Sequence, residues 1–76
     1  MIEELDNVVL ARDLPGHRLK AGDVGAVVYI YEEGDGLEVE FVSGEGTTVA
    51  VVTLRREDVR PIGREEILHV RALASV

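Results

Sequence analysis

The stretch Gly22–Tyr31 constrains the fold more than any other part of this chain. A turn at Gly22-Asp23 opens directly into an apolar run that is rich in β-branched and aromatic residues. Such residues fit a pleated, half-buried surface, so the run predicts a strand that leaves a turn. A second turn cluster, Glu32–Gly36, follows, and Leu37–Val42 predicts the returning strand. The centre of the chain is therefore expected to form a β-hairpin.

The alternation of residue types predicts the register of this hairpin. A four-residue turn over 32–35 gives one face that is entirely apolar and is made of the pairs Ile30–Leu37, Val28–Val39 and Ala26–Phe41. The opposite face then carries aromatic and acidic side chains, namely Tyr29, Tyr31, Glu38 and Glu40. A slip by one residue would set charged side chains against the core, so the four-residue turn is favoured.

Three further strands are expected around the hairpin. Asn7–Ala11 predicts the first strand, and a long loop, whose Leu14 and Leu19 are expected to fold back onto the core, separates it from Gly22. Thr47–Leu54 predicts a long fourth strand, and Val59–Ile62 predicts a short last strand that Pro61 restricts to an edge. Five short strands, with a long loop after the first and a polar helical turn before the last, follow the order of an SH3-like barrel. The sequence therefore predicts an all-β protein built as a small five-stranded SH3-like barrel.

The centre of the predicted fourth strand does not alternate with polar residues, which is typical of a strand covered on both faces. Two sets of side chains are compatible with the inner face, Ala50 with Val52 and Leu54, or Val49 with Val51. The other face must be covered by the C-terminal segment or by a second copy of the protein. Val49 and Val51 are therefore candidates for self-association or for packing of that segment.

The chain is long enough for one domain. Residues 1–63 are expected to form the barrel, and residues 64–76, here called the C-terminal segment, are expected to pack on the barrel or on a second protomer. Acidic residues early in the segment and Arg71 late in it suit a helix dipole. Alternation of Leu68, Val70 and Ala72 with polar residues suits a strand, and an extended covering segment is favoured.

The residues that are absent exclude several classes of protein. The chain has no cysteine, which excludes disulfides, thiolate zinc sites and thiol nucleophiles and fits a reducing compartment. No apolar run approaches the roughly 18 residues of a membrane span. The first residues are acidic, whereas a secretory signal begins with basic residues. A cytoplasmic protein with no membrane partner is expected.

Charge is distributed unevenly along the chain, whose formal net charge is −7. Residues 1–54 contain eleven acidic and three basic residues, whereas residues 55–76 are close to neutral. An acidic body repels a phosphate backbone, so no nucleic-acid partner is expected, and a basic protein surface would be attracted.

No arrangement of side chains predicts catalysis. The two histidines, His17 and His69, have no second histidine at metal-ligand spacing, and a zinc site needs about three protein ligands. The serines and threonines have no nearby histidine–acid pair, and no glycine loop runs from a strand into a helix. We therefore expect no enzyme, no catalytic residue, no metal and no cofactor.

Longer motifs resemble a known family. The motifs are Glu4-Leu5-Asp6-x-Val8-Val9-Leu10, Asp13-Leu14-Pro15-x-x-x-Leu19-Lys20-x-Gly22-Asp23-x-Gly25-x-Val27-Val28, Glu38-Val39-Glu40-Phe41-Val42, Val49-Ala50-Val51-Val52-Thr53-Leu54 and Asp58-Val59-Arg60-Pro61. Together they resemble the bacterial family known as domain of unknown function 4926. The resemblance implies a small stand-alone bacterial protein with an SH3-like fold and no established activity.

The Gly-Asp-x-Gly-x-Val hairpin is more distantly similar to KOW-type barrels and to the barrel of the nitrile hydratase β subunit. KOW-type domains are usually basic where they meet RNA, and this chain is acidic, so their function is not carried over.

The most suggestive surface pairs Tyr29 and Tyr31 with Glu38 and Glu40. Exposed aromatic side chains on SH3-like barrels often receive peptides, and carboxylates favour a basic one. The alternative is that the rings shield neighbouring strands or meet the C-terminal segment. We expect a non-enzymatic protein-interaction module whose partner has a basic or an apolar surface, and one version of this role is an antitoxin or inhibitor. A self-associating homodimer is the alternative, and a KOW-type nucleic-acid module ranks third.

Overall fold

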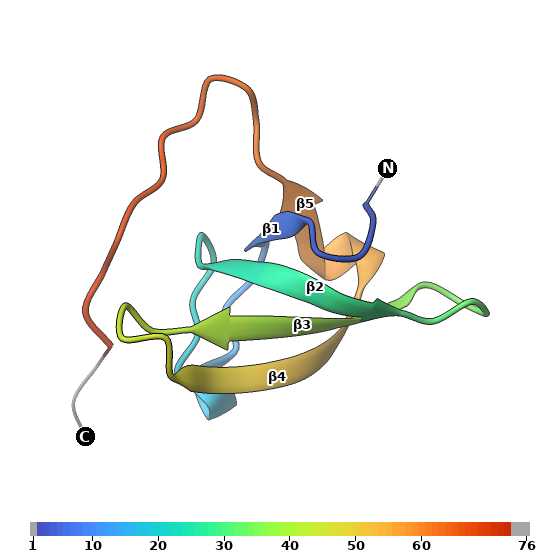
Figure 1. Ribbon diagram of the computed structural model, residues 1–76, viewed down its shortest axis with the longest axis horizontal. Coiled ribbons are helices and arrows are strands. Elements are labelled where there is room, and N and C mark those ends of the chain that lie inside the picture. Colours follow the sequence, from blue (N-terminus) through green and yellow to red (C-terminus); the bar gives the residue numbers. More distant parts are fainter. Residues whose placement is uncertain (1, 74–76) are drawn as a thin grey trace.

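The computed structural model describes residues 2–73 and is an all-β fold (Figure 1). Its strands are β1 (Asn7–Leu10), β2 (Val24–Ile30), β3 (Gly36–Val42), β4 (Thr48–Arg55) and β5 (Val59–Pro61). Two short 3₁₀ helices, η1 (Pro15–His17) and η2 (Arg56–Asp58), lie in the connections. All five strands form one antiparallel sheet in the order β4-β3-β2-β1-β5. The predicted all-β, five-stranded class is confirmed.

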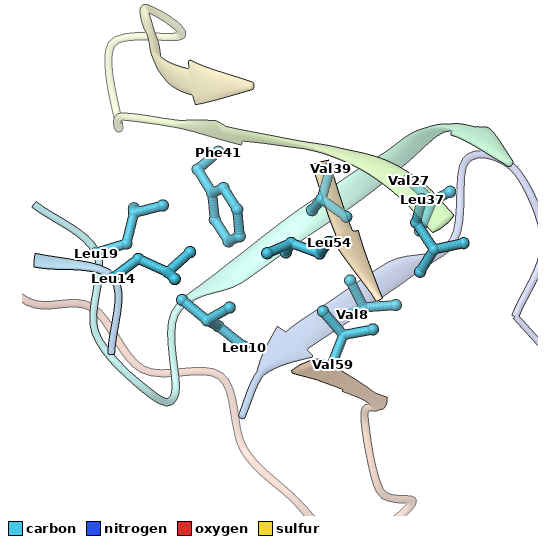
Figure 2. Close-up of a cluster of buried hydrophobic side chains, with 10 residues drawn as sticks. All are labelled: Val8, Leu10, Leu14, Leu19, Val27, Leu37, Val39, Phe41, Leu54 and Val59. Carbon is cyan, nitrogen blue, oxygen red and sulfur yellow. The ribbon is translucent and has the colours of Figure 1, made fainter. Parts of the chain in front are cut away.

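The sheet is rolled around a single hydrophobic core. Leu54 of β4 and Val59 of β5, which belong to the two edge strands, both point into this core (Figure 2). The connection between the two edges is only the single turn η2. Leu14 and Leu19 of the loop around η1 are buried beside Phe41 and complete one end of the core, as the sequence predicts. A buried side chain of this kind contributes about 1.5–3 kcal/mol.

The predicted register of the central hairpin is correct beside its turn and wrong farther away. Ile30 pairs with Leu37, but a β-bulge at Val28 places Val27, not Val28, opposite Val39. Val27 is fully buried, whereas 40% of Val28 is exposed. Because of this extra residue, the side chains of β2 that precede the bulge point to the opposite faces from those predicted.

Close packing at Gly25 explains why the inverted register is favourable. Gly25 faces the core, and a Cβ there would lie 2.7 Å from Val39 Cγ1 and 2.8 Å from Phe41 Cε2. The ring of Phe41 therefore occupies the space that a side chain at position 25 would need. Ala26 pairs with Glu40 instead of Phe41, contrary to the predicted pairing.

Of the two alternatives for the inner face of β4, the structure has the one made of Ala50, Val52 and Leu54. Leu54 is buried, and Ala50 and Val52 pack partly buried against the core. Val51 points away and is 51% exposed. An irregularity in the β3–β4 pairing leaves Val49 without a partner, and its side chain also packs against the core.

The turn before β2 combines a glycine in the left-handed region with a capping carboxylate. Gly22 has φ +99°, a conformation that glycine adopts without strain. The Lys20 amide donates a hydrogen bond to Asp23 Oδ2 (2.8 Å), so this carboxylate caps the turn.

After β5 the chain continues without regular secondary structure to the end of the described residues. Figure 1 shows residues 62–73 leaving β5 as a wide loop that returns beside the β3–β4 turn. Neither the helix nor the strand considered for the C-terminal segment forms over 64–73, and the rest of that prediction lies outside the described residues. No helix within residues 2–73 is long and apolar enough to cross a membrane.

Candidate functional site

Tyr29 and Tyr31 lie together at the hairpin end of β2. Their ring centroids are 5.0 Å apart with an interplanar angle of 77°, which is an edge-to-face contact. The exposed fractions of the two side chains are 49% and 41%. An edge-to-face pair contributes about 0.5–1.5 kcal/mol beyond the area it buries, so the rings hold each other in place.

The carboxylate of Glu38 is held from both neighbouring strands. The Tyr31 hydroxyl and the Thr53 hydroxyl each donate a hydrogen bond of 2.6 Å to Glu38 Oε2. These bonds, that from Thr53 first, lower the pKa of Glu38 below its usual 4.5. The same contact with Glu38 raises the pKa of Tyr31, which keeps its hydroxyl protonated as the donor. Glu38 is therefore a fixed negative charge beside the ring pair.

Glu40 lies one step farther along the same face of β3. It pairs with Ala26 on β2 and with Val51 on β4, and Thr48 donates a 2.7 Å hydrogen bond to Glu40 Oε2. The carboxylate is thus oriented by a hydroxyl from β4, as Glu38 is.

The structure therefore brings together the four side chains that the sequence places on one face. We call Tyr29, Tyr31, Glu38 and Glu40 the tyrosine face. Hydrogen bonds or ring contact join Tyr29, Tyr31 and Glu38 directly, and Glu40 is their neighbour on β3.

Sequence reasoning missed the two threonines that orient these carboxylates. Thr53 and Thr48 lie on β4, and their contact with Glu38 and Glu40 depends on the register between β3 and β4. The sequence does contain one signal for these contacts, the threonines of one predicted strand beside the glutamates of its neighbour. Side chains of these types form cross-strand pairs.

Val49 and Val51, which the sequence groups as one candidate surface, are not on the same surface. Val51 is exposed between Glu40 and the free edge of β4, whereas Val49 lines a groove at one end of the sheet. The described part of the C-terminal segment reaches that groove, and Val51 remains exposed.

The groove has a volume of about 480 Å³ and lies between the five-stranded domain and the C-terminal segment. Its apolar lining includes Leu19, Val24, Phe41, Val49 and Leu73.

An ion pair joins the two walls of the groove. The guanidinium of Arg71 donates to Asp23 Oδ1 (2.8 Å), to Asp23 Oδ2 (2.6 Å) and to the carbonyl oxygen of Arg18 (2.9 Å). The hydrogen bond from Arg71 lowers the pKa of Asp23 below 3.8, and the Lys20 amide adds to this effect. Nothing in the sequence indicates this pairing, because the two residues are far apart along the chain.

The remaining polar residues to consider are the two histidines and the buried Asp58. His17 is exposed on η1, and His69 is exposed at the rim of the groove. Within residues 2–73, no three histidine, aspartate or glutamate side chains are grouped so that they could hold a metal ion. Asp58, which is only 8% exposed, accepts hydrogen bonds from Arg12 Nε (2.9 Å) and from the Arg55 amide (3.0 Å). This buried carboxylate joins the turn η2 to the end of β1.

These features define a class: a small acidic all-β domain of five strands that carries an exposed aromatic and carboxylate face. Residues 4–61 match the family model described as Domain of unknown function (DUF4926), and the chain belongs to that family. The predicted family membership is therefore confirmed. The match includes all five strands and ends before the C-terminal segment. Neither the curated proteins nor the solved structures gave a significant match to this chain.

Proposed function

We propose that this protein is a non-enzymatic interaction module whose tyrosine face binds a basic segment of a partner protein. The observation that carries the proposal is the exposed edge-to-face pair of Tyr29 and Tyr31, which is tied through the Tyr31 hydroxyl to the ionised carboxylate of Glu38. Exposed aromatic rings beside fixed carboxylates suit a lysine or arginine side chain, which stacks on the ring and pairs with the charge.

Preorganisation supports this role. The ring pair is held by mutual contact, and both carboxylates are held by threonine hydroxyls from β4. Binding to groups that are already fixed costs little side-chain entropy, so a modest contact area can give measurable affinity.

The charge of the whole body supports a basic partner. Eleven acidic and three basic residues in 1–54 produce a negative field that attracts cationic segments and speeds their association. One form of this function is an antitoxin or inhibitor that covers a basic surface of its partner. The lack of cysteine agrees with a cytoplasmic place of action.

The test uses a defined probe, a peptide of about ten residues that alternates arginine and glycine, long enough to cross the face in an extended form. Titration is followed by nuclear magnetic resonance of the labelled protein. We expect shifts centred on Tyr29, Tyr31 and Glu38, with affinity that falls as salt rises. The Tyr31→Ser variant should weaken binding roughly tenfold, which corresponds to about 1.4 kcal/mol.

A matched control separates the tyrosine face from the general charge of the body. Glu38→Gln and Glu65→Gln remove one negative charge each, but Glu65 is an exposed residue of the C-terminal segment and is not part of the tyrosine face. We expect the first substitution to weaken peptide binding and the second to leave it nearly unchanged. Equal losses, or no shifts at the tyrosines, would overturn the proposal.

Nucleic acid serves as the negative probe in the same titration. A single-stranded oligonucleotide of similar length is expected not to bind at low salt, because the acidic body repels phosphates. Oligonucleotide binding in preference to the peptide would instead support the KOW-type alternative.

A further inference from the structure

The outer edge of β4 is an unpaired β-strand edge. β4 is the last strand of the sheet, and it is eight residues long. Within residues 2–73, no backbone hydrogen bond outside the β3–β4 ladder reaches Thr48–Leu54. One side of this backbone therefore presents free N–H and C=O groups.

This edge lacks the features that usually prevent strand-to-strand association. The sequence Thr48–Leu54 contains no charged residue, no proline and no glycine. Its central side chain, Val51, is 51% exposed. An uncharged, apolar strand with a free edge is a template for pairing with another strand. The other sheet edge, β5, differs because it is three residues long and ends in Pro61.

We propose that two copies of this chain associate by antiparallel pairing of their β4 edges around a two-fold axis near Val51. Antiparallel pairing of identical strands is self-complementary, so the same hydrogen-bonding groups serve both copies. The pairing would bring Val51 of each copy to the centre of the contact. It would join the two sheets into one and leave the tyrosine face of each copy open, so the inference does not depend on the proposed function.

The charges at the two ends of β4 favour a second copy as the occupant. Glu45 lies in the turn before β4. At the other end Arg55 pairs with Glu57 and Asp58 pairs with Arg12, so within residues 2–73 Arg56 is left there without an acidic partner. In an antiparallel pairing centred on Val51, position 46 of one copy faces position 56 of the other, which brings Glu45 beside Arg56. A parallel pairing would instead bring like charges together at each end.

The contact is expected to be weak. Two paired edges bury less surface than the roughly 800 Å² per partner of a standard interface, so a dissociation constant of order 0.1 mM is expected. Sedimentation equilibrium of the full chain from about 10 µM to about 1 mM should show a mass rising from that of a monomer toward a dimer. A monomer mass throughout this range would overturn the proposal.

Two lysine substitutions locate the interface. Val51→Lys places a charge at the centre of the edge, and Val28→Lys places the same charge on β2 at a residue of similar exposure. We expect Val51→Lys to abolish the mass increase and Val28→Lys to retain it. Equal loss in both variants, or loss on Tyr29→Ser instead, would show that the copies meet through their faces and would overturn the edge pairing.

Charge reversal and amide exchange keep the proposal testable if Val51→Lys fails to fold, which circular dichroism would reveal. Glu45→Arg and Arg56→Glu should each weaken association, and the double variant should restore it. In the wild-type chain, amide exchange of residues 48–54 should slow as concentration rises, whereas exchange in β5 should not. The proposal would be contradicted if the double variant did not regain association, or if amide exchange in β4 did not depend on concentration.

Discussion

At the scale of single residues, the tyrosine face depends on side chains that hold one another. Tyr31 and Thr53 both donate to the same oxygen of Glu38, so strand β4 and the residue that follows β2 both fix the position of one carboxylate on β3. The geometry fixes both the charge and the direction in which it points. A ligand therefore meets a defined arrangement of rings and charge.

The pKa of Glu38 reports these bonds. Thr53→Val and Tyr31→Phe should each raise the pKa of Glu38 toward 4.5, and the effect of Thr53→Val should be the larger because its bond dominates. Because folding lowers this pKa, the stabilisation is present above pH 4.5 and is lost as the pH falls through the folded value. Carboxyl resonances followed through a pH titration would measure the shift.

Thr47→Val is the control for that titration, since the Thr47 hydroxyl makes no hydrogen bond to Glu38. The pKa of Glu38 should be the same in this variant as in the wild type. An unchanged Glu38 pKa in Thr53→Val would show that the hydroxyl does not hold the carboxylate in solution.

Asp58 is the buried polar residue on which the β4–β5 connection depends. Asp58→Ala leaves the Arg55 amide and the Arg12 guanidinium without their acceptor, so we expect a loss of about 1–3 kcal/mol of unfolding free energy in urea at pH 7. The exposed neighbour Glu57 is the control, and Glu57→Ala should change stability by less than about 0.5 kcal/mol.

The same residue predicts a pH dependence. The hydrogen bond from Arg12, followed by that from the Arg55 amide, lowers the pKa of Asp58 below 3.8. The contribution of Asp58 to stability is therefore complete above pH 3.8 and lost as the pH falls through the lowered value. If Asp58→Ala lost the same unfolding free energy above and below this pH range, the assignment would be contradicted.

At the scale of elements, the bulge in β2 decides which residues form the core. Val27 and Val28 are adjacent and identical in type, yet the first is fully buried and the second is 40% exposed. The bulge allows Gly25 to lie under Phe41 and Val27 to face Val39, and a regular ladder would put Val28 inside. Core packing therefore outweighs the regular alternation of the hairpin.

The pair Val27→Asp and Val28→Asp tests this assignment directly. A charge at Val27 would be buried without a partner, so cooperative thermal unfolding monitored by circular dichroism should disappear. The same charge at Val28 should change stability by less than about 0.5 kcal/mol because that side chain reaches water. The reverse result would restore the regular register.

At the scale of the whole molecule, the five-stranded domain and the C-terminal segment differ in how deeply their side chains are buried. The core residues come from Val8 to Val59, and none comes from residues 64–73, the described part of the C-terminal segment. Within 64–73, Ile67, Leu68 and Val70 remain exposed, and Arg71 anchors the chain to Asp23. A segment with few buried contacts opens more readily than the domain that carries it.

Arg71→Ala should therefore release the segment and leave the five-stranded domain folded. We expect faster proteolysis within residues 64–73, an Asp23 pKa closer to 3.8, and an unfolding transition that is nearly unchanged. Arg64→Ala is the control and should alter none of these measurements. A large loss of global stability in Arg71→Ala would show that the segment is part of the cooperative unit.

Much of this protein follows from local sequence. Strand positions follow from runs of β-branched residues, turns follow from glycine beside acidic residues, and alternation places Tyr29, Tyr31, Glu38 and Glu40 on one face. These features depend on residues close together in the chain, where backbone preference and side-chain period act directly. The loop residues Leu14 and Leu19 are predicted to be buried for a similar reason, because apolar side chains in a polar loop leave water.

Only the tertiary structure decided the features that depend on distant residues. The bulge that buries Val27 results from packing of β2 against Phe41 on β3. The sequence did not decide which side chains of β4 face the core, because its apolar run does not alternate with polar residues. The bond from Arg71 to Asp23 and the bonds from β4 threonines to Glu38 and Glu40 join segments whose proximity arises from strand order. Local sequence carries no information on such contacts, because packing of the whole core selects among registers of similar local energy.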